Sequence, residues 1–212
     1  MRCPLCRAAS ELVAMHRERE AFLCGVCDLA FLHPRHHVTH TEARAEYLLH
    51  DNTMECEGYV RMFEEKIATV EEQCEGISSV LDFGCGPGPV LVELLRRRGY
   101  EAVGYDPLFF PAADLDRTYD CVISTEVFEH FTDPAAELVN VGRLVRPGGY
   151  LAVMTLLHGE GCDFSTWWYL NMPSHVVFYS ARTFTWIAGE HGYELVYSDD
   201  TRFVILRKSD TV

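Results

Sequence analysis

The sequence lacks a long hydrophobic segment. No apolar run in its 212 residues approaches the roughly 18 to 20 residues that a membrane-spanning helix needs. The opening stretch, MRCPLCRAAS, has no apolar core of the kind found in a secretory signal, and the chain contains neither a low-complexity tract nor an internal repeat. With 48% hydrophobic and 24% charged residues, the composition is that of an ordinary soluble globular protein with no membrane anchor.

Positive charge is also scarce. Eighteen Lys and Arg residues stand against 32 Asp and Glu, which gives a formal net charge of −14. Because nucleic-acid binding draws its affinity largely from basic side chains that neutralise phosphates, this balance argues against a nucleic-acid partner. The one local basic cluster, Arg96 to Arg98, follows the periodic stretch VLVELL and is predicted to be the last turn of a helix, where cations complement the helix dipole.

Cysteine, in contrast, is abundant. Nine cysteines without an export signal indicate the reducing cytoplasm, where thiols bind metals or stay free. Four of them form two C-x-x-C pairs, CPLC and CGVC, with seventeen residues between the pairs: Cys3, Cys6, Cys24 and Cys27. Two such knuckles can close a tetrahedral thiolate cage, and a segment of about thirty residues has too small a core to fold without a cross-link.

We therefore predict a structural zinc ribbon over residues 1–38. Two short strands should flank the second knuckle, where Gly25 suits a tight turn. Disulfides and a redox-active C-x-x-C pair are the alternatives. A structural zinc site has all four positions filled by protein, so we assign it to folding and substrate docking and not to catalysis.

Beyond the ribbon the chain changes character twice. Residues 39–76 have helical apolar spacing and are predicted to form two helices joined by a turn, as a lid or linker. Over residues 77–212, strand and helix patterns alternate. The predicted strands are 78–84, 101–106, 119–127 and 149–157, the predicted helices are 89–99, 133–149 and 180–192, and two final strands cover 193–200 and 201–208. Repeated βα units imply an α/β fold with a Rossmann-like, mostly parallel sheet that binds ligands at the carboxyl ends of its strands.

The stretch VLDFGCGPGPV places three glycines at alternate positions directly after an apolar strand. Such a bend lets the backbone approach a ligand closely, and the ligand is either a pyrophosphate or a positively charged group. The dinucleotide fingerprint needs a small residue at position 89, where this chain has Pro89. In addition, Asp82 at the strand end would repel a pyrophosphate by on the order of a few kcal/mol at near-contact distance, whereas it would attract an ammonium or a sulfonium.

S-adenosylmethionine (SAM) carries both of these cationic groups, and its carboxylate can lie near the amino terminus of the following helix. Asp106, which closes the next strand in VGYD, is placed to accept hydrogen bonds from the ribose hydroxyls, with a turn-forming role before Pro107 as the alternative. The sequence therefore favours a SAM site. Its predicted contacts are Asp82, Gly84, Cys85, Gly86, Gly88, Asp106 and Glu126.

Four segments in order, DFGCGPG, GYD, YDCVISTEVFEHFTDP and LVRPGGYLAVMT, resemble the successive motifs of class I SAM-dependent methyltransferases, and the likeness covers residues 77 to about 207. The front segment, ending in CGVCDLAFLHP, resembles the zinc ribbon that precedes such domains in some bacterial enzymes, including sugar C-methyltransferases. The resemblance implies a mostly parallel sheet whose last strand is antiparallel. Only PLFFPAADLDRT joins Asp106 to the next core strand, which is too short for the family's usual helix and strand, so we expect a trimmed sheet edge. Leu108 or Phe109 is a candidate cover for the adenine.

Methyl transfer requires alignment of donor and acceptor and removal of a proton from the acceptor. Within TEVFEH, Glu126, Glu129 and His130 have i, i+3, i+4 spacing and would share one face of a helical turn. His175 lies in a later loop that should cover the same pocket. These four residues resemble the divalent-metal ligands of small-RNA 2′-O-methyltransferases and of ubiquinone-pathway O-methyltransferases.

That resemblance implies a second metal, held by Glu126, Glu129, His130 and His175, which would bind two vicinal oxygens of a substrate and lower the pKa of the attacking one. Two alternatives stay open. One is an acid–base role for His130 or His175 with Glu129 beside them. The other is a structural role in which Glu126 faces the methionine end of SAM and the rest brace the helix.

Two further features bear on the acceptor. The WWY stretch at residues 167–169 forms either a substrate wall or the core of its own loop. The helices between residues 41 and 76, with Tyr47, Asn52 and Tyr59, either close over the cofactor or simply pack on the sheet.

The leading hypothesis is a cytoplasmic SAM-dependent methyltransferase that acts on an oxygen or carbon of a small molecule, such as a sugar, a polyketide-like metabolite or a catechol. One alternative is an rRNA or tRNA methyltransferase whose ribbon grips RNA, which the negative charge opposes. Another is a non-catalytic SAM-binding adaptor, which the intact glycine bend and the two aspartates oppose.

Overall fold

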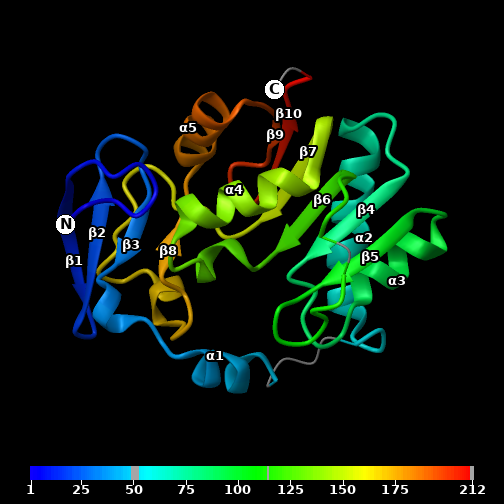
Figure 1. Cartoon of the computed structure of the whole chain (residues 1–212). Coiled ribbons are helices and arrows are strands. Elements are labelled where there is room, and N and C mark those ends of the chain that lie inside the picture. Colours follow the sequence, from blue (N-terminus) through cyan, green and yellow to red (C-terminus); the bar gives the residue numbers. More distant parts are fainter. Residues whose placement is uncertain (49–52, 114, 211–212) are drawn as a thin grey trace.

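The computed structural model describes residues 1–48, 53–113 and 115–210. In this part of the chain the strands form one six-stranded sheet and one four-stranded sheet, and α1 (His40–Tyr47) runs between the two in Figure 1. None of the helices in these ranges has the length and apolar character that crossing a membrane requires. The predicted lid residue Asn52 lies outside the described residues.

The six-stranded sheet has the order β5-β4-β6-β7-β10-β9. Its first four strands run parallel to one another: β4 (Ser79–Phe83), β5 (Glu101–Tyr105), β6 (Tyr119–Thr125) and β7 (Val145–Met154). β9 (Tyr193–Ser198) and β10 (Phe203–Lys208) form a hairpin, and β10 is antiparallel to both of its neighbours. The predicted Rossmann-like, mostly parallel sheet with an antiparallel last strand is confirmed.

β5 is an edge strand, because the described residues of segment 107–118 form neither a helix nor a strand between β5 and β6. A single bridge between Asp106 and Phe110 closes the first turn of this connection. A crossover between parallel strands usually takes about a dozen residues or more for one helix alone, so the segment has no room for a helix and an additional strand. The trimmed edge predicted from its length is confirmed.

Helices cover both faces of the sheet (Figure 1). α2 (Glu57–Gln73) and α3 (Val90–Arg97) pack on one face, and α4 (Pro134–Leu144) and α5 (Ala181–His191) pack on the other. Two apolar cores result, one on each side of the sheet, and they orient the strands so that the carboxyl ends of β4 to β6 stay accessible.

Side chains along β10 show how one strand serves both cores. Phe203 and Ile205 belong to the core under α2 and α3, whereas Val204 and Leu206 belong to the core under α4 and α5. Successive side chains of a strand point to opposite faces, so a strand buried on both sides reads as a continuous apolar run.

The ends of α4 and α5 follow local sequence signals. The Asp133 carboxylate accepts a hydrogen bond from an amide of the first turn of α4, and Pro134 occupies the first helical position. Ser180 and Thr183 form a reciprocal capping box at the start of α5. Gly192 ends α5 with a φ of 70°. These caps place the first residues of both helices and the end of α5 where the sequence predicted them, at residues 133, 180 and 192.

The predicted helix over 133–149 is wrong in its last third. α4 ends at Leu144, and β7 begins at the next residue, Val145. Pro147 has no amide hydrogen and cannot continue a helix, and Gly148 adopts a φ of 68°. The RPGG stretch therefore opens the strand instead of closing the helix.

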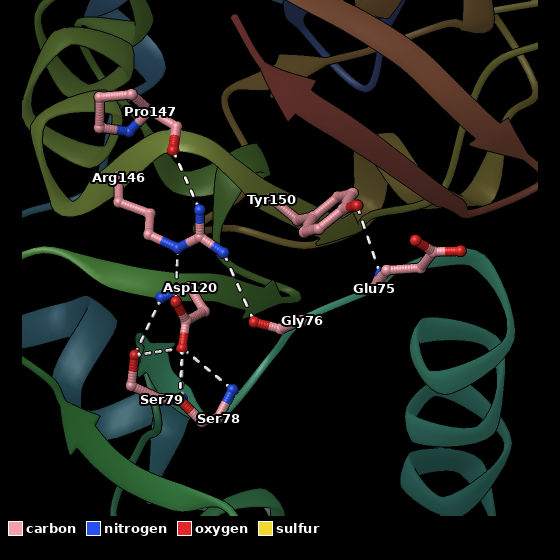
Figure 2. A network of polar contacts seen from close by, with 8 residues as sticks. All are labelled: Glu75, Gly76, Ser78, Ser79, Asp120, Arg146, Pro147 and Tyr150. Carbon is pink, nitrogen blue, oxygen red and sulfur yellow. Dashed lines mark hydrogen bonds and ion pairs between the residues drawn. The ribbon is translucent and has the colours of Figure 1, made fainter. Parts of the chain in front are cut away.

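Asp120 ties together the amino-terminal ends of three strands, as Figure 2 shows. Its carboxylate accepts hydrogen bonds of 2.8 to 2.9 Å from the amides and hydroxyls of Ser78 and Ser79, and another from Nε of Arg146. Arg146 also donates to the carbonyl of Gly76. Burial by itself would raise the pKa of Asp120, but the hydrogen bonds from Ser79, Ser78 and Arg146 lower it. This network lies at the amino-terminal ends of the strands, whereas the ligand site is expected at their carboxyl ends.

The amino-terminal sheet has three strands of its own, namely β1 (Ser10–His16), β2 (Arg19–Cys24) and β3 (Ala30–Leu32). The sequence predicts only two of these strands. β1 gives no clear signal, because several apolar side chains of SELVAMH are exposed and the stretch shows no clean alternation. The fourth strand, β8 (Val177–Phe178), lies between β7 and α5 in the chain and pairs antiparallel with β3. The ribbon therefore shares one sheet with a segment of the α/β fold.

Candidate cofactor and acceptor site

A cavity of about 940 Å³ lies at the carboxyl ends of β4, β5 and β6. Ligand cavities usually measure about 300 to 1,000 Å³, so this one has room for a cofactor together with an acceptor. Its walls come from the glycine bend after β4, from α1, α2 and α4, and from segment 159–176, which we call the aromatic loop.

The glycine bend turns sharply at the end of β4. Gly84 and Gly86 adopt φ values of 85° and 63°, which other residues rarely occupy. A Cβ on Gly84 would lie 2.3 Å from a methyl carbon of Val127, so a larger residue would have to displace that side chain. The amides of Gly84 and Cys85 both donate to the carbonyl of Tyr105, at 2.7 and 3.0 Å. Four predicted cofactor contacts in the bend line the cavity: Gly84, Cys85, Gly86 and Gly88.

Asp82 stands at the end of β4 and lines the same cavity, with a side chain that is only 3% exposed. Burial, followed by repulsion from Asp106, raises the pKa of Asp82 to about 8. Its Oδ1 has no hydrogen-bond partner among the described residues. A buried carboxyl without compensation favours a cationic ligand group, because a nearby cation stabilises the charged form.

Asp106 directly follows β5 and organises the turn that comes next. Its Oδ1 accepts hydrogen bonds from the amides of Leu108 and Phe109, at 2.8 and 3.1 Å, and its Oδ2 accepts one from Gly86 at 3.2 Å. The turn-forming role is therefore present, at a position that also lines the cavity. Of the two candidate adenine covers, Leu108 lines the cavity, whereas the Phe109 ring lies 5.4 Å from the guanidinium of Arg44 in α1.

Glu126 and Glu129 meet at a third side chain, Tyr169 of the aromatic loop. The Tyr169 hydroxyl lies 2.6 Å from Glu129 and 3.1 Å from Glu126. Burial, followed by repulsion from Glu129, raises the pKa of Glu126 to about 8, and burial raises the pKa of Glu129 as well. Two buried carboxyls beside one hydroxyl ionise together only at a large electrostatic cost, so the pair retains a proton at neutral pH.

The predicted helical turn through Glu126 is wrong. The short 3-10 helix covers only Phe128–His130, and Glu126 precedes it with a φ of 53°. Left-handed backbone at a residue other than glycine is uncommon and persists where the surrounding structure imposes it, often at functional sites. Glu126, Glu129 and His130 therefore do not share a helix face, and the aromatic loop is what brings the two carboxyls together.

His130 and His175 pack edge to face, with ring centroids 4.9 Å apart. Nδ1 of His130 lies 3.0 Å from the carbonyl of Ser174. In the neutral imidazole that nitrogen carries the hydrogen, and Nε2 is then the atom that accepts a proton or binds a metal. Tyr47 of α1 packs against the His130 ring at 5.2 Å between centroids, so the predicted lid contacts this pair directly.

The structure brings together three of the four predicted ligands of a second metal. Ligand atoms of Glu129, His130 and His175 all lie within 4.8 Å of one another, and Glu126 is not part of this group. Imidazole and carboxylate donors suit a divalent metal that keeps open positions for substrate oxygens. The residues therefore fit a three-ligand centre, and Glu126 belongs instead to the carboxyl pair at Tyr169.

The four cysteines of the ribbon converge. Sγ of Cys3 lies 3.5 Å from that of Cys27, Sγ of Cys6 lies 3.4 Å from that of Cys24, and all four sulfurs lie within 4.8 Å of one another. None of the four is in a disulfide. Tetrahedral Zn²⁺ with Zn–S bonds of about 2.3 Å requires sulfurs at roughly this separation, so the donor set fits zinc.

Gly25 lies in the turn of the second knuckle, as predicted, although without a positive φ. The left-handed residues are Arg7 and Asp28, one at the same place in each knuckle, with φ values of 65° and 61°. Their amides donate to the carbonyls of Cys3 and Cys24 at 3.0 and 2.9 Å. The repeated geometry holds each C-x-x-C pair around a common centre.

The three aromatic residues that the sequence predicted as a substrate wall lie in different surroundings. Trp168 lines the cavity and is 57% exposed, and Tyr169 also lines it. Trp167 packs instead in the ribbon core, where its ring lies 5.4 Å from that of Phe178. Trp168 thus fits the substrate-wall interpretation and Trp167 the local-core one, whereas Tyr169 is buried in the same core and fits both.

α4 forms one wall of the cavity, which the sequence did not predict. Glu137, Asn140 and Arg143 of this helix line the cavity. Their spacing of three residues places them along one side of a helix, which is the signal that could have found them. The sequence does not show which side of α4 faces the carboxyl ends of the strands. Polar residues at this spacing are therefore equally typical of a helix face exposed to solvent.

The profile of the family described as "Methyltransferase domain" matches residues 32–198. The chain is 29% identical to the ubiquinone biosynthesis O-methyltransferase of Proteus mirabilis, in a match that covers 41% of this chain and 46% of that protein. It thus spans about half the length of the curated relatives it matches.

Two solved structures share the fold. One is magnesium protoporphyrin IX methyltransferase from Synechocystis PCC 6803 with bound SAH, with a TM-score of 0.50 and 18% identity over 72% of this chain and 84% of that chain. The other is an O-methyltransferase family protein from Burkholderia thailandensis, with a TM-score of 0.53 and 18% identity over 82% of this chain and 61% of that chain. Since the family profile covers most of the sequence and the sheet is mostly parallel with an antiparallel last strand, as the motifs implied, the chain belongs to the methyltransferase domain family, that of the class I SAM-dependent methyltransferases.

Proposed function

We propose that this protein transfers a methyl group from SAM to an oxygen or carbon atom of a small-molecule acceptor. The observation that carries the proposal is that one cavity is lined both by a buried carboxyl with an unpartnered oxygen, Asp82, and by Glu126, His130 and His175, with Glu129 buried behind them. The first suits a cationic methyl donor, and the second suits removal of a proton from the acceptor.

At the donor end, Asp82 attracts the ammonium and sulfonium side of SAM, and the backbone of the glycine bend lies against the cofactor. Asp106 accepts hydrogen bonds from the ribose hydroxyls. Glu126 faces the methionine end. Tyr47 and Tyr59 from α1 and α2 line the same cavity, which supports a lid that excludes water from the methyl-transfer step.

At the acceptor end, His130 and His175 are the groups that accept the proton, and Glu129 stands beside them. A divalent cation bound by Glu129, His130 and His175 would lower the pKa of an acceptor hydroxyl. In either case the anchored Nδ1 of His130 leaves Nε2 as its reactive nitrogen. A chelator separates the two modes, because acid–base chemistry by the histidines needs no added ion.

In the ribbon, Cys3, Cys6, Cys24 and Cys27 hold a structural zinc ion. The fit of the four sulfurs supports this assignment. All four positions are filled by protein, so this ion stabilises the ribbon and does no methyl-transfer chemistry.

A small-molecule acceptor is supported by the relative from Proteus mirabilis, whose name assigns it to ubiquinone biosynthesis. An RNA acceptor receives no support from the ribbon. Arg7 pairs with Asp133 at 3.2 Å, and Arg19 donates to backbone carbonyls of the aromatic loop. These side chains are engaged within the protein, and the net charge of −14 opposes a phosphate backbone.

Calorimetric titration with SAM tests the donor assignment. Asp82→Asn should bind SAM about 10- to 100-fold more weakly than the wild type, which is the equivalent of one lost charge-assisted hydrogen bond. Asp200→Asn is the matched control, since Asp200 is exposed and Asn tolerates its φ of 56°. Equal affinities in the wild type and Asp82→Asn would overturn the assignment.

Mass spectrometry tests the acceptor. The protein is incubated with SAM and a panel of catechols, sugar nucleotides and a metabolite extract, and products heavier by one CH₂ unit are sought alongside SAH. Transfer to RNA in a parallel incubation, without transfer to any small molecule, would contradict the proposed acceptor class.

A further inference from the structure

The aromatic loop, residues 159–176, carries two of the side chains that meet at the acceptor end of the cavity. Tyr169 contacts the two carboxyls, and His175 packs against His130. The loop lies between the ribbon strands and the six-stranded sheet (Figure 1). Its backbone forms short turns instead of a long helix or strand, so its shape depends on what holds its carbonyls.

One guanidinium holds four of those carbonyls. Nη1 of Arg19 donates to the carbonyls of Leu170 and Met172, the latter at 3.0 Å, and Nη2 donates to those of Pro173 and His175 at 3.2 and 3.0 Å. The planar fork of Arg presents its donors in a fixed geometry, which a Lys ammonium does not reproduce. Arg19 thus spans the backbone from the residue after Tyr169 to His175 itself.

A second ribbon side chain holds the same loop. His16 lies opposite Arg19 in the β1–β2 hairpin and is 7% exposed. Its Nδ1 lies 2.7 Å from the carbonyl of Ser165, and its Nε2 lies 2.6 Å from Oδ1 of Asn171. The hairpin tip is therefore bonded to the loop on both sides of Trp168: at Ser165, before the short helix Trp168–Asn171, and at Asn171, the last residue of that helix.

The tip of that hairpin has a backbone that its own sequence does not favour. Arg17 and Glu18 adopt φ values of 46° and 68°, in a two-residue turn of the kind that normally takes Asn-Gly or Gly-Gly. Such a conformation persists where the surroundings impose it. The contacts of His16 and Arg19 with the aromatic loop are on either side of this turn, so loop and hairpin brace each other.

We infer that Arg19 is a positioning residue for methyl transfer: it fixes the aromatic loop so that Tyr169 and His175 face the acceptor. This inference rests on the proposed function. β2 begins at Arg19 and ends at Cys24, so the strand that presents the guanidinium is anchored at its other end in the four-cysteine centre. The ribbon is then part of the acceptor site, although it contributes no reacting atom.

Hydrogen–deuterium exchange measured by mass spectrometry tests the inference without any acceptor. In Arg19→Gln, peptides covering residues 163–176 should exchange about tenfold faster or more than in the wild type, because local opening costs less once the carbonyls lose their donor. SAM affinity should stay close to that of the wild type, since the hydrogen bonds described for the glycine bend and for Asp106 join these two segments to each other. Arg17→Gln, an exposed arginine on the same turn, is the matched control and should leave the exchange unchanged.

Catalysis supplies the second readout. With the acceptor that the wild type methylates fastest, Arg19→Gln should lose about 10- to 100-fold in kcat/KM, the usual effect of removing an orienting group, with wild-type SAM affinity. Arg19→Lys, which keeps the charge, should exchange at an intermediate rate and covers the case that Arg19→Gln does not fold. Wild-type exchange in both Arg19 variants would overturn the inference. Failure of the wild type to bind SAM or to methylate any acceptor would instead overturn the proposed function, and the exchange result would still decide whether Arg19 fixes the loop.

Discussion

The hydroxyl of Tyr169 lies 2.6 Å from the carboxylate of Glu129, forty residues earlier in the chain. This contact joins the aromatic loop to the segment after β6, and Glu129 is fully buried at the junction. A substitution that removes this hydroxyl takes one hydrogen-bond donor away from the buried Glu129 carboxyl.

Tyr169→Phe should therefore lower the free energy of unfolding by about 1 to 3 kcal/mol, the cost of leaving a buried polar group without its donor. It should also reduce methyl transfer, and SAM affinity should fall less than in Asp82→Asn, because the Tyr169 hydroxyl reaches the proposed SAM contacts through Glu126. Chemical denaturation and SAH formation measure the two effects. Tyr100→Phe is the control, because that hydroxyl bonds to Glu71 at 3.2 Å on the surface. Equal stabilities of the two variants would show that the Tyr169–Glu129 contact contributes nothing.

SAM binding should release a proton from Asp82. Its pKa of about 8 in the free protein means that most molecules hold a proton on this carboxyl at pH 7, and the cationic cofactor favours the ionised form. Calorimetric titrations at pH 7 in buffers of different ionisation enthalpy count the protons released. The wild type should release close to one more proton than Asp82→Asn. Identical counts would contradict the contact between Asp82 and the cationic end of SAM.

The same carboxyl should destabilise the ligand-free protein at high pH. The pKa of Asp82 is 3.8 unperturbed and about 8 in the fold, so the folded state binds more protons between these values and stability falls as pH rises through them. Asp82→Asn removes this penalty. Without SAM, the Tm of Asp82→Asn should exceed that of the wild type by more at pH 8.5 than at pH 5. A difference that does not change with pH would be inconsistent with a raised pKa.

Removing zinc should disorder more than the ribbon. A strong chelator should release about one zinc ion per chain, measured by elemental analysis, and should accelerate exchange in residues 1–38. Because Arg19 and His16 bond to the aromatic loop, residues 163–176 should lose protection at the same chelator concentration. Cys56→Ser is the control, since Cys56 lies outside both the four-cysteine group and the aromatic loop.

If residues 163–176 stay protected after zinc has left, the folding of the ribbon does not hold the aromatic loop, and this prediction is wrong. If activity disappears at a lower chelator concentration, before any zinc is released, a second ion at Glu129, His130 and His175 is indicated instead. The order in which activity and zinc are lost thus distinguishes the two metal sites.

Asp120→Asn should lower the free energy of unfolding by about 2 to 3 kcal/mol, because the Arg146 guanidinium would lose its carboxylate and the amides of Ser78 and Ser79 would lose a charged acceptor (Figure 2). The pKa of Asp120 is lowered in the fold. Its contribution is therefore present above its unfolded pKa of 3.8 and is lost as pH falls below that value. Denaturation curves of wild type and variant should converge toward pH 2. Glu93→Gln, which removes an exposed ion pair with Arg97, should change stability by less than about 0.5 kcal/mol at either pH.

Local signals made much of the fold predictable. Asp133 with Pro134, Ser180 with Thr183, and Gly192 act within one helical turn, so their effect is visible in a short stretch of sequence. The predicted helix over 133–149 ran into β7 because an apolar run that continues past a helix does not reveal where burial by neighbouring strands takes over.

The sequence by itself determined the alternation of strands and helices, the glycine bend with Asp82 beside it, and the pairing of cysteines three residues apart, because each depends on residues that are close in the chain. Only the tertiary structure decided that Tyr169 reaches Glu129, that β8 joins the ribbon sheet and that Arg19 caps four carbonyls more than a hundred residues away. Such contacts depend on how separately formed elements pack, and no local spacing encodes that geometry.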